Sequence, residues 1–251
     1  MKPPNELPSH AAEAIPDSDP AQIRQFANLV LGRREGCIEL RVIGNSRSSD
    51  FWLRKTLSGF YDDIDQLVTD SLANHGLRSV YFGLNPRKPE LLHAKPANRL
   101  TEGEAGKDSD TLARCLLGFD LDTRTPIKGI ASSAQELKAA EAAFTSTVGD
   151  LESKGVEPLR GYSGNGRHGM VILKPYALDA LHDDKKTGSF GLLFRYFSRK
   201  YSDLHAEVDV GVFNPSRVWK AYGTCAIKGA NTIERPWRTA TFAIPDTLPD
   251  P

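Results

Sequence analysis

The sequence lacks long apolar segments and paired cysteines. It has no run of about 18 apolar residues, the minimum for a helix that crosses a bilayer, so no membrane partner is expected. The N-terminal stretch MKPPNELPSHAAEAIPDSDP has no apolar core of the kind found in secretory signals. The three cysteines, Cys37, Cys115 and Cys225, lie far apart and include no C-x-x-C pair. This pattern predicts a reducing, cytoplasmic location and no structural zinc.

The chain also has no excess charge of either sign. Lys plus Arg equals Asp plus Glu, at 32 each among 251 residues, which argues against a globally basic nucleic-acid binder but leaves a local basic patch possible. The 21 glycines and 16 prolines are too few for a low-complexity chain. Proline-rich residues 1–18 are predicted to form a flexible tail, and 245–251 a linker to a helicase or accessory domain.

The first half of the chain, residues 19–115, is predicted to form a small α/β module. A helix should follow Asp19-Pro20, since Asp is a good N-cap and Pro suits the first helical position. Apolar spacing predicts strands at 37–44 and 79–84 and a helix at 62–76.

The second half, residues 116–244, is predicted to form an RRM-like module, making the whole chain α+β. Within it, residues 116–213 follow a β-α-β-β-α-β order, the ferredoxin-like pattern. Strands are expected at 116–122, 156–163, 168–175 and 206–213, and helices after Ser133 and at 189–202. Right-handed crossovers then place the first strand between the third and the fourth, antiparallel to both.

This topology brings polar side chains from separate segments to one edge of the sheet. Asp120 and Asp122 are two residues apart on one strand and therefore share a face. Ser163 ends the second strand, His168 begins the third, and Asp209 lies in the fourth. The sequence therefore predicts a common site for these residues.

The aspartates suggest a metal site. Two carboxylates on one face repel each other, and a divalent cation relieves this; Mg²⁺ and Mn²⁺ prefer such oxygen ligands. Asp209 could help to hold a second ion, as in two-metal phosphoryl transfer. The alternative is a pair of solvated aspartates at the end of a strand.

Two further features suggest phosphate and nucleic-acid binding. The turn around Asn165, in SGNGR, exposes backbone N–H groups next to His168, although an ordinary hairpin with a structural histidine would look the same. Residues 214–238 hold five basic side chains, one acid and three interleaved aromatic rings. A solvated strand face is the alternative there. The basic residues are Arg217, Lys220, Lys228, Arg235 and Arg238.

Three motifs, in order, resemble the archaeo-eukaryotic primase superfamily, in particular the primase-polymerase domains of phage, plasmid and mobile-element replication proteins. They are FDLD, SGNGRHG, and VDVGVFNPSRVWKAYGT followed by KG. The resemblance implies a catalytic palm packed on an N-terminal α/β module, with the active site in the cleft between them. Many relatives have proline directly after the second aspartate and arginine three residues after it, where this chain has Thr123 and Thr125.

The resemblance also implies roles for particular residues. Asp120, Asp122 and Asp209 would be the catalytic metal ligands. Ser163, Asn165 and His168 would contact the incoming nucleotide, and Arg217 and Lys220 the triphosphate. Further candidates for template or nucleotide contact are Asn98, Arg99 and Lys228.

We therefore predict a DNA primase/polymerase that uses NTP or dNTP, a single-stranded DNA template and a primer, with Mg²⁺ or Mn²⁺ in a two-metal site. One alternative is a non-catalytic RRM-like module that binds single strands; the acids on the first strand, in place of aromatic residues, count against it. Another is a different metal-dependent phosphoryl-transfer enzyme, such as a nuclease or nucleotide cyclase. A D-x-D glycosyltransferase would need a Rossmann pattern that is missing here.

Overall fold

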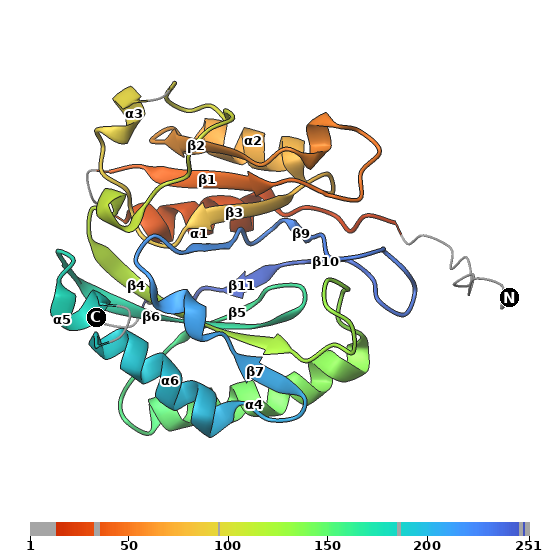
Figure 1. Cartoon of the computed structure of the whole chain (residues 1–251), viewed down its shortest axis with the longest axis vertical. Helices are drawn as coiled ribbons and strands as arrows, with labels where there is room; N and C mark the ends of the chain where they lie inside the picture. The colour runs from red at the N-terminus through yellow and green to blue at the C-terminus, as the bar shows by residue number, and fades with distance from the viewer. Residues whose placement is uncertain (1–13, 33–35, 95, 185–186, 246–247, 249–251) are drawn as a thin grey trace, which may run out of the picture.

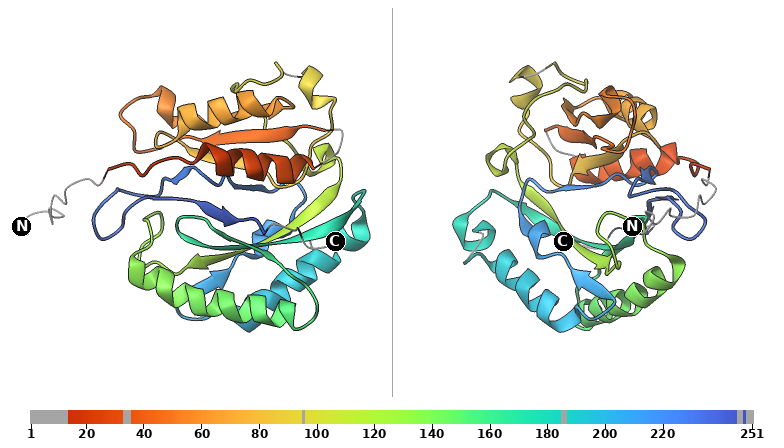
Figure 2. Two further views of the ribbon diagram at one scale, coloured as in Figure 1. Left: turned by 180° about the vertical axis from the view of Figure 1, so that it is seen from behind. Right: turned by 45° about the vertical axis from the view of Figure 1, so that its right-hand side comes forward.

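The computed structural model describes residues 14–32, 36–94, 96–184, 187–245 and 248. Two antiparallel sheets form the centre of the molecule (Figure 1). Helices α1 and α2 pack on one side of the first sheet, and α4 and α6 cover the side of the second sheet that faces away from the first (Figure 2). None of the described helices is both long and apolar enough to span a membrane.

The first sheet has the strand order β2-β1-β3-β8. Helix α1 begins where predicted, because the Asp19 carboxylate accepts hydrogen bonds from the backbone N–H groups of Ala21 and Gln22 and Pro20 occupies the first turn. The sequence analysis missed one strand of this sheet, the segment LSGFY. The elements are α1 (Pro20–Leu31), β1 (Ile38–Ile43), η1 (Trp52–Arg54), β2 (Leu57–Tyr61), α2 (Ile64–Asn74), β3 (Ser79–Gly83), α3 (Leu91–Ala94) and η2 (Asp108–Asp110).

The second sheet has the order β11-β5-β6-β4-β7. Its strand β4 lies between β6 and β7 and is antiparallel to both, in the order that the sequence predicts. The capping box of Ser133 and Glu136 starts α4 as expected. The elements are β4 (Arg114–Thr123), α4 (Ala134–Glu152), β5 (Leu159–Tyr162), β6 (Gly166–Tyr176), α5 (Ala180–Asp183), α6 (Ser189–Tyr201), β7 (Ala206–Val208) and β11 (Thr241–Ala243).

The predicted strand at 206–213 is shorter in the structure. It ends at Val208, because the Asp209 carboxylate accepts a hydrogen bond from the N–H of Gly211 and starts the 3₁₀ turn η3 (Val210–Phe213). Asp209 therefore follows β7 instead of lying within a strand. Its backbone N–H still donates to the carbonyl of Asp120, at 3.0 Å, which keeps the two aspartates side by side.

The predicted boundary between two modules is not strict. Strand β8 (Val218–Lys220) pairs with β3 of the first sheet, although it comes from the segment assigned to the second module. The chain then forms a two-stranded ribbon, β9 (Cys225–Ala226) with β10 (Arg238–Thr239), before β11 joins the second sheet beside β5. The C-terminal segment therefore belongs to both halves.

Part of the predicted tail at 1–18 is packed against the body. The carbonyl of Pro16 lies 2.8 Å from Nε2 of His75, and the carbonyl of Asp17 accepts a hydrogen bond of 2.6 Å from the hydroxyl of Thr239. Residues 1–13 lie outside the described part of the chain, as do all but Pro245 and Leu248 of the predicted linker at 245–251.

One apolar core extends through both halves. The Phe26 ring of α1 packs on Phe82 of the first sheet and on Phe242 of the second, with ring centroids 5.8 and 6.0 Å apart. The side-chain oxygen of Asn85, which follows β3, accepts hydrogen bonds from the N–H groups of Cys115 and Leu116 at the start of β4, at 2.8 and 2.9 Å. These contacts fix the position of the two sheets relative to each other.

A buried ion pair ties the first sheet to the segment before β8. Glu39 on β1 and Arg87 are both 0% exposed, and Nη2 of Arg87 lies 2.8 Å from Oε2 of Glu39. Other guanidinium nitrogens of Arg87 donate to the hydroxyl of Thr111 at 2.9 Å and to the carbonyl of Ser216 at 2.7 Å. Arg87 therefore holds the turn that immediately precedes Arg217.

Candidate active site

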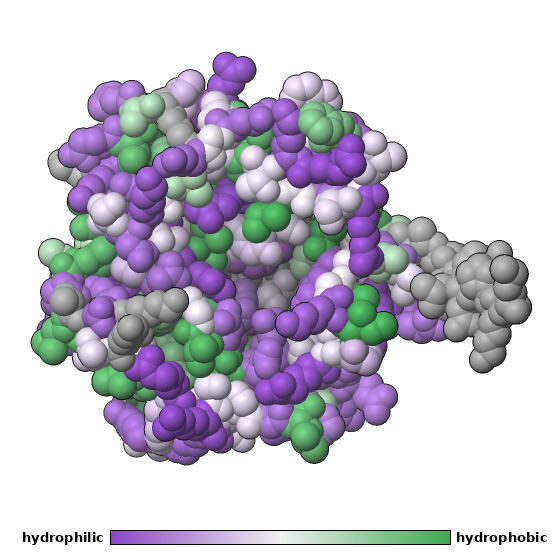
Figure 3. All heavy atoms as spheres, in the orientation of Figure 1, coloured by the Kyte–Doolittle hydropathy of each residue, from purple (hydrophilic) through white to green (hydrophobic). Residues whose placement is uncertain are grey.

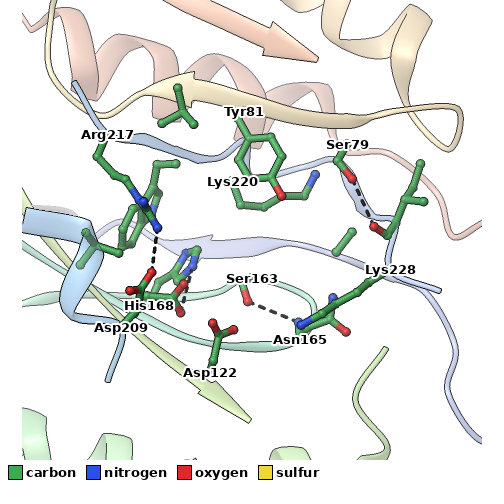
Figure 4. A pocket seen from close by; sticks show the side chains of 16 residues that line it. Ser79, Tyr81, Asp122, Ser163, Asn165, His168, Asp209, Arg217, Lys220 and Lys228 are labelled. Carbon is green, nitrogen blue, oxygen red and sulfur yellow. Dashed lines mark hydrogen bonds and ion pairs between the residues drawn. The ribbon is translucent and has the colours of Figure 1, made fainter. Parts of the chain in front are cut away.

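A cavity of about 340 Å³ lies between the two sheets. In the face shown in Figure 3 the surface is hollowed at this level, and Figure 4 shows the side chains that line the cavity. Every residue predicted for the site except Asn98 and Arg99 lines it. These residues are Asp120, Asp122, Ser163, Asn165, His168, Asp209, Arg217, Lys220 and Lys228.

The two aspartates of β4 crowd the floor of this cavity. Asp120 is opposite His168 in the register of β4 and β6, and Asp122 is opposite Gly166. Oδ1 of Asp120 is buried without a hydrogen-bond partner among the described residues. The charge of Asp120 and then burial raise the pKa of Asp122 to about 7, although the nearby Lys228 ammonium opposes this. The pair is therefore short of positive charge.

Asp209 lies beside this pair but is already engaged. Its Oδ2 accepts a hydrogen bond of 2.7 Å from Nη2 of Arg217, and its Oδ1 accepts one of 2.7 Å from the N–H of Gly211. Across the described residues, no three His, Cys, Asp or Glu side chains form a group that could hold a metal ion. The three aspartates predicted as metal ligands thus share the cavity without forming a ready ligand set.

His168 is held in a chain of hydrogen bonds. The indole N–H of Trp219, which can only donate, lies 2.9 Å from the hydroxyl oxygen of Tyr222, and that oxygen lies 3.0 Å from Nδ1 of His168. With Trp219 donating to it, Tyr222 has its own O–H to donate to Nδ1, an arrangement in which the histidine proton is on Nε2. Nε2 is 3.5 Å from Oδ1 of Asp120. The imidazole thus presents an N–H group toward the aspartates.

The glycine turn lies against the C-terminal ribbon. Gly164 has a φ of +94°, and a Cβ there would lie 2.4 Å from Cβ of Ala226, so only glycine fits. The Ser163 hydroxyl accepts a hydrogen bond of 3.3 Å from the N–H of Asn165. The side-chain oxygen of Asn165 accepts one of 3.0 Å from the N–H of Ser132. This packing places the turn at the wall of the cavity.

Lys220 is buried, and its amino group is used by the protein itself. Nζ donates to the carbonyl of Val80 at 3.2 Å, to the hydroxyl of Thr224 at 2.7 Å and to the carbonyl of Cys225 at 2.9 Å. Burial lowers the pKa of Lys220 to about 7. In this structure Lys220 joins β3 to the segment that leads into β9, and a phosphate would have to replace one of these acceptors.

Asn98 and Arg99 are not brought to the cavity. Asn98 has a φ of +54°, and its side-chain oxygen accepts hydrogen bonds from the N–H groups of Asp62 and Asp63, both at 3.0 Å, at the start of α2. Arg99 is exposed beside it. The segment therefore organises the N-terminus of a helix.

The basic residues of 214–238 do not form one surface. Nη2 of Arg235 lies 2.8 Å from Oε1 of Glu136, and Nη1 of Arg238 donates to the carbonyl of Ser132 at 2.7 Å. Both arginines thus fix the loop before α4, whereas Arg217 and Lys228 line the cavity.

The residues of the cavity wall that sequence reasoning missed include Ser79 and Tyr81 on β3. Burial, and then the charges of Asp120 and Asp122, raise the pKa of Tyr81. The signal was present in the segment SVYFG, because alternate positions of a strand share a face and Ser79 and Tyr81 are two apart. Strand alternation alone could therefore have grouped these two residues on one face.

No protein-family model matches this chain, and no curated protein matches it. It is similar to two solved structures, a primase and a polymerase domain. One is primase RepB′, at 13% identity and a TM-score of 0.44, covering 88% of this chain and 56% of that one. The other is the polymerase domain of Mycobacterium tuberculosis Ligase D in complex with DNA, at 16% identity and a TM-score of 0.47, covering 88% and 79%. The chain thus spans about half of the RepB′ chain.

Proposed function

We propose that this chain is a template-dependent nucleotidyltransferase, which adds nucleotides from NTP or dNTP to a primer on single-stranded DNA. The observation that carries the proposal is the pair Asp120 and Asp122, with a buried, unpartnered oxygen on one and a raised pKa on the other, facing a cavity that also contains cationic side chains. Buried like charges of this kind are costly unless a cation joins them.

The chemistry of the aspartates suits a divalent cation, although they do not form a complete ligand set among the described residues. Asp120 and Asp122 would hold Mg²⁺ or Mn²⁺ through hard oxygen ligands, and Asp209 would contribute once Arg217 leaves it. Bound there, the metal would lower the pKa of the primer 3′-hydroxyl and neutralise charge on the pyrophosphate leaving group. We propose that the second sheet acts as the RRM-like palm of this reaction, with β3 and β8 of the first sheet as its cover.

The triphosphate would bind between Arg217 and Lys228. Arg217 and Lys228 are both only partly buried, so each could reach a phosphate oxygen. Nε2 of His168 would donate to the same group in the tautomer in which Tyr222 donates to Nδ1. Catalysis would then come from positioning and charge stabilisation, with no covalent intermediate on the protein.

The proposal is tested by nucleotide incorporation on primed and unprimed single-stranded DNA, in Mg²⁺ and in Mn²⁺. Asp120→Asn should lower incorporation by at least about a hundred-fold, the usual effect of removing one group that stabilises transition-state charge. It should also lose Mn²⁺ binding measured by electron paramagnetic resonance. The matched control is Asp65→Asn, which changes an exposed carboxylate on α2.

Full activity and Mn²⁺ binding in Asp120→Asn would contradict the metal assignment. A folded wild-type chain that binds single-stranded DNA equally well in EDTA, and incorporates nothing with either metal, would favour a binding module. Degradation of DNA without a nucleoside triphosphate, or a cyclic nucleotide product, would favour another phosphoryl-transfer enzyme. Product without a primer would show that priming resides in this chain.

A further inference from the structure

The loop between β1 and β2 exposes two large aromatic side chains. Phe51 is 58% exposed and Trp52 63%, and their rings meet edge to face with centroids 5.9 Å apart. Adjacent exposed rings form a contiguous apolar patch, and such patches rimmed by polar side chains mark interaction sites.

Basic side chains surround these rings. Nζ of Lys55 lies 4.2 Å from the centroid of the Trp52 ring and 5.2 Å from that of Phe51, and the guanidinium of Arg54 lies 5.5 Å from the Phe51 centroid. Lys55 also pairs with Glu102, at 2.6 Å. Within residues 45–56 the basic residues are Arg47, Arg54 and Lys55, against the single acid Asp50.

The loop is attached to the wall of the cavity. Nη2 of Arg78 donates to the carbonyl of Trp52 at 2.6 Å, and the next residue, Ser79, lines the cavity. Nη2 of Arg47 lies 3.5 Å from the carbonyl of Gly129, and a Cβ on Gly229 would lie 3.3 Å from Nη1 of Arg47. The loop therefore adjoins the end of the cavity that Lys228 lines. Both ribbon views place it on the same side of the molecule as the β9–β10 ribbon (Figures 1 and 2).

We propose that Phe51 and Trp52 form a stacking surface for the single-stranded template beside the cavity; this inference rests on the proposed function. Aromatic rings stack on any base, and neighbouring cations neutralise the backbone phosphates, so such surfaces bind single strands with little sequence preference. An apolar face of a partner protein would fit less well, because it would have to desolvate the Lys55 and Arg54 cations that lie over the rings.

The test measures binding of fluorescein-labelled oligothymidylate by anisotropy, in EDTA and without nucleotide, so that catalysis plays no part. Phe51→Ala and Trp52→Ala should each weaken binding by on the order of ten-fold, the usual loss for one stacked base. Trp52→Phe should keep most of the wild-type affinity, whereas Trp52→Leu should lose it, because only phenylalanine retains an aromatic ring. Saturating oligothymidylate should quench the fluorescence of Trp52, an effect missing in Trp52→Phe.

The matched control is Tyr196→Ala on α6. Tyr196 is 49% exposed and has Nζ of Lys200 5.5 Å from its ring centroid, so its surroundings resemble those of Trp52. It lies on α6, however, which packs on the side of the second sheet that faces away from the cavity (Figure 2). Unchanged binding in Phe51→Ala and Trp52→Ala, or an equal loss in Tyr196→Ala, overturns the inference. If these two variants bind and extend like the wild type, the stacking surface fails while the proposed function stands. If the wild type binds oligothymidylate but never incorporates nucleotides, the proposed function fails. The binding affinities of the variants still show whether Phe51 and Trp52 form a stacking surface.

Discussion

The buried pair of Glu39 and Arg87 allows a quantitative prediction. Glu39→Gln keeps the shape of the side chain but leaves the Arg87 guanidinium 0% exposed without its counter-charge. Removing one partner of such a pair costs about 3–5 kcal/mol in the free energy of unfolding. For a chain of this size each kcal/mol shifts Tm by about 2–4 °C, so a fall of about 6–20 °C is expected.

The measurement is urea unfolding followed by the fluorescence of the buried Trp219, together with thermal unfolding. The control is Glu152→Gln, because the pair of Glu152 and Arg160 is 43% and 55% exposed and should contribute less than about 1 kcal/mol. The double variant Glu39→Leu/Arg87→Met should be more stable than Glu39→Gln, since it buries no unpaired charge.

Additive losses in the double variant would refute this reasoning. A loss of less than about 1 kcal/mol of unfolding free energy in Glu39→Gln would also refute it, because a loss that small is typical of exposed ion pairs. Arg41 also contacts Glu39 and is 21% exposed, so its guanidinium can turn to water when Glu39 is replaced. The predicted loss of unfolding free energy in Glu39→Gln therefore arises from the unpaired charge of Arg87 alone.

Two further predictions concern the residues around the cavity. Tyr222→Phe removes a hydroxyl that serves both Trp219 and His168, leaving two buried polar groups unpaired, and should lower the free energy of urea unfolding by about 2–4 kcal/mol; an unchanged midpoint would contradict the hydrogen-bond chain. For Lys220, burial lowers the pKa from 10.5 to about 7, so between about pH 7 and pH 10 the unfolded chain binds a proton that the native chain does not. Stability of the wild type should therefore rise with pH in this window relative to Lys220→Met, and equal slopes of unfolding free energy against pH would show that Lys220 stays charged.

The arrangement of the aspartates could be predicted from the sequence because it depends on local pattern and chirality. Alternation places Asp120 and Asp122 on one face, and right-handed crossovers place β4 between β6 and β7. The structure brings His168 opposite Asp120, as this reasoning requires. Their roles in metal and nucleotide binding stay predictions.

Other features depend on contacts between distant segments, which no local pattern encodes. Strand β2 contains Gly59, a weak strand former, and is a strand because it pairs with β1. The carbonyl of Arg99 lies 2.2 Å from where a Cβ on Gly59 would be, so the glycine is required by a neighbour 40 positions away in the chain. The burial of Lys220 and the pairing of Glu39 with Arg87 likewise depend on distant segments, since Lys220 contacts Val80 and Glu39 pairs with a residue 48 positions away.

The path of the chain between the sheets limits how the molecule can move. It crosses from the first sheet to the second before Arg114, returns before Val218, and crosses again between Ala226 and Thr241. Two of these crossings lie side by side, because Asp108 accepts hydrogen bonds from the backbone N–H and the hydroxyl of Ser216, whereas the third is a separate connection. The apolar core also extends through both halves. A protease cut in any single crossing should therefore leave the two halves associated.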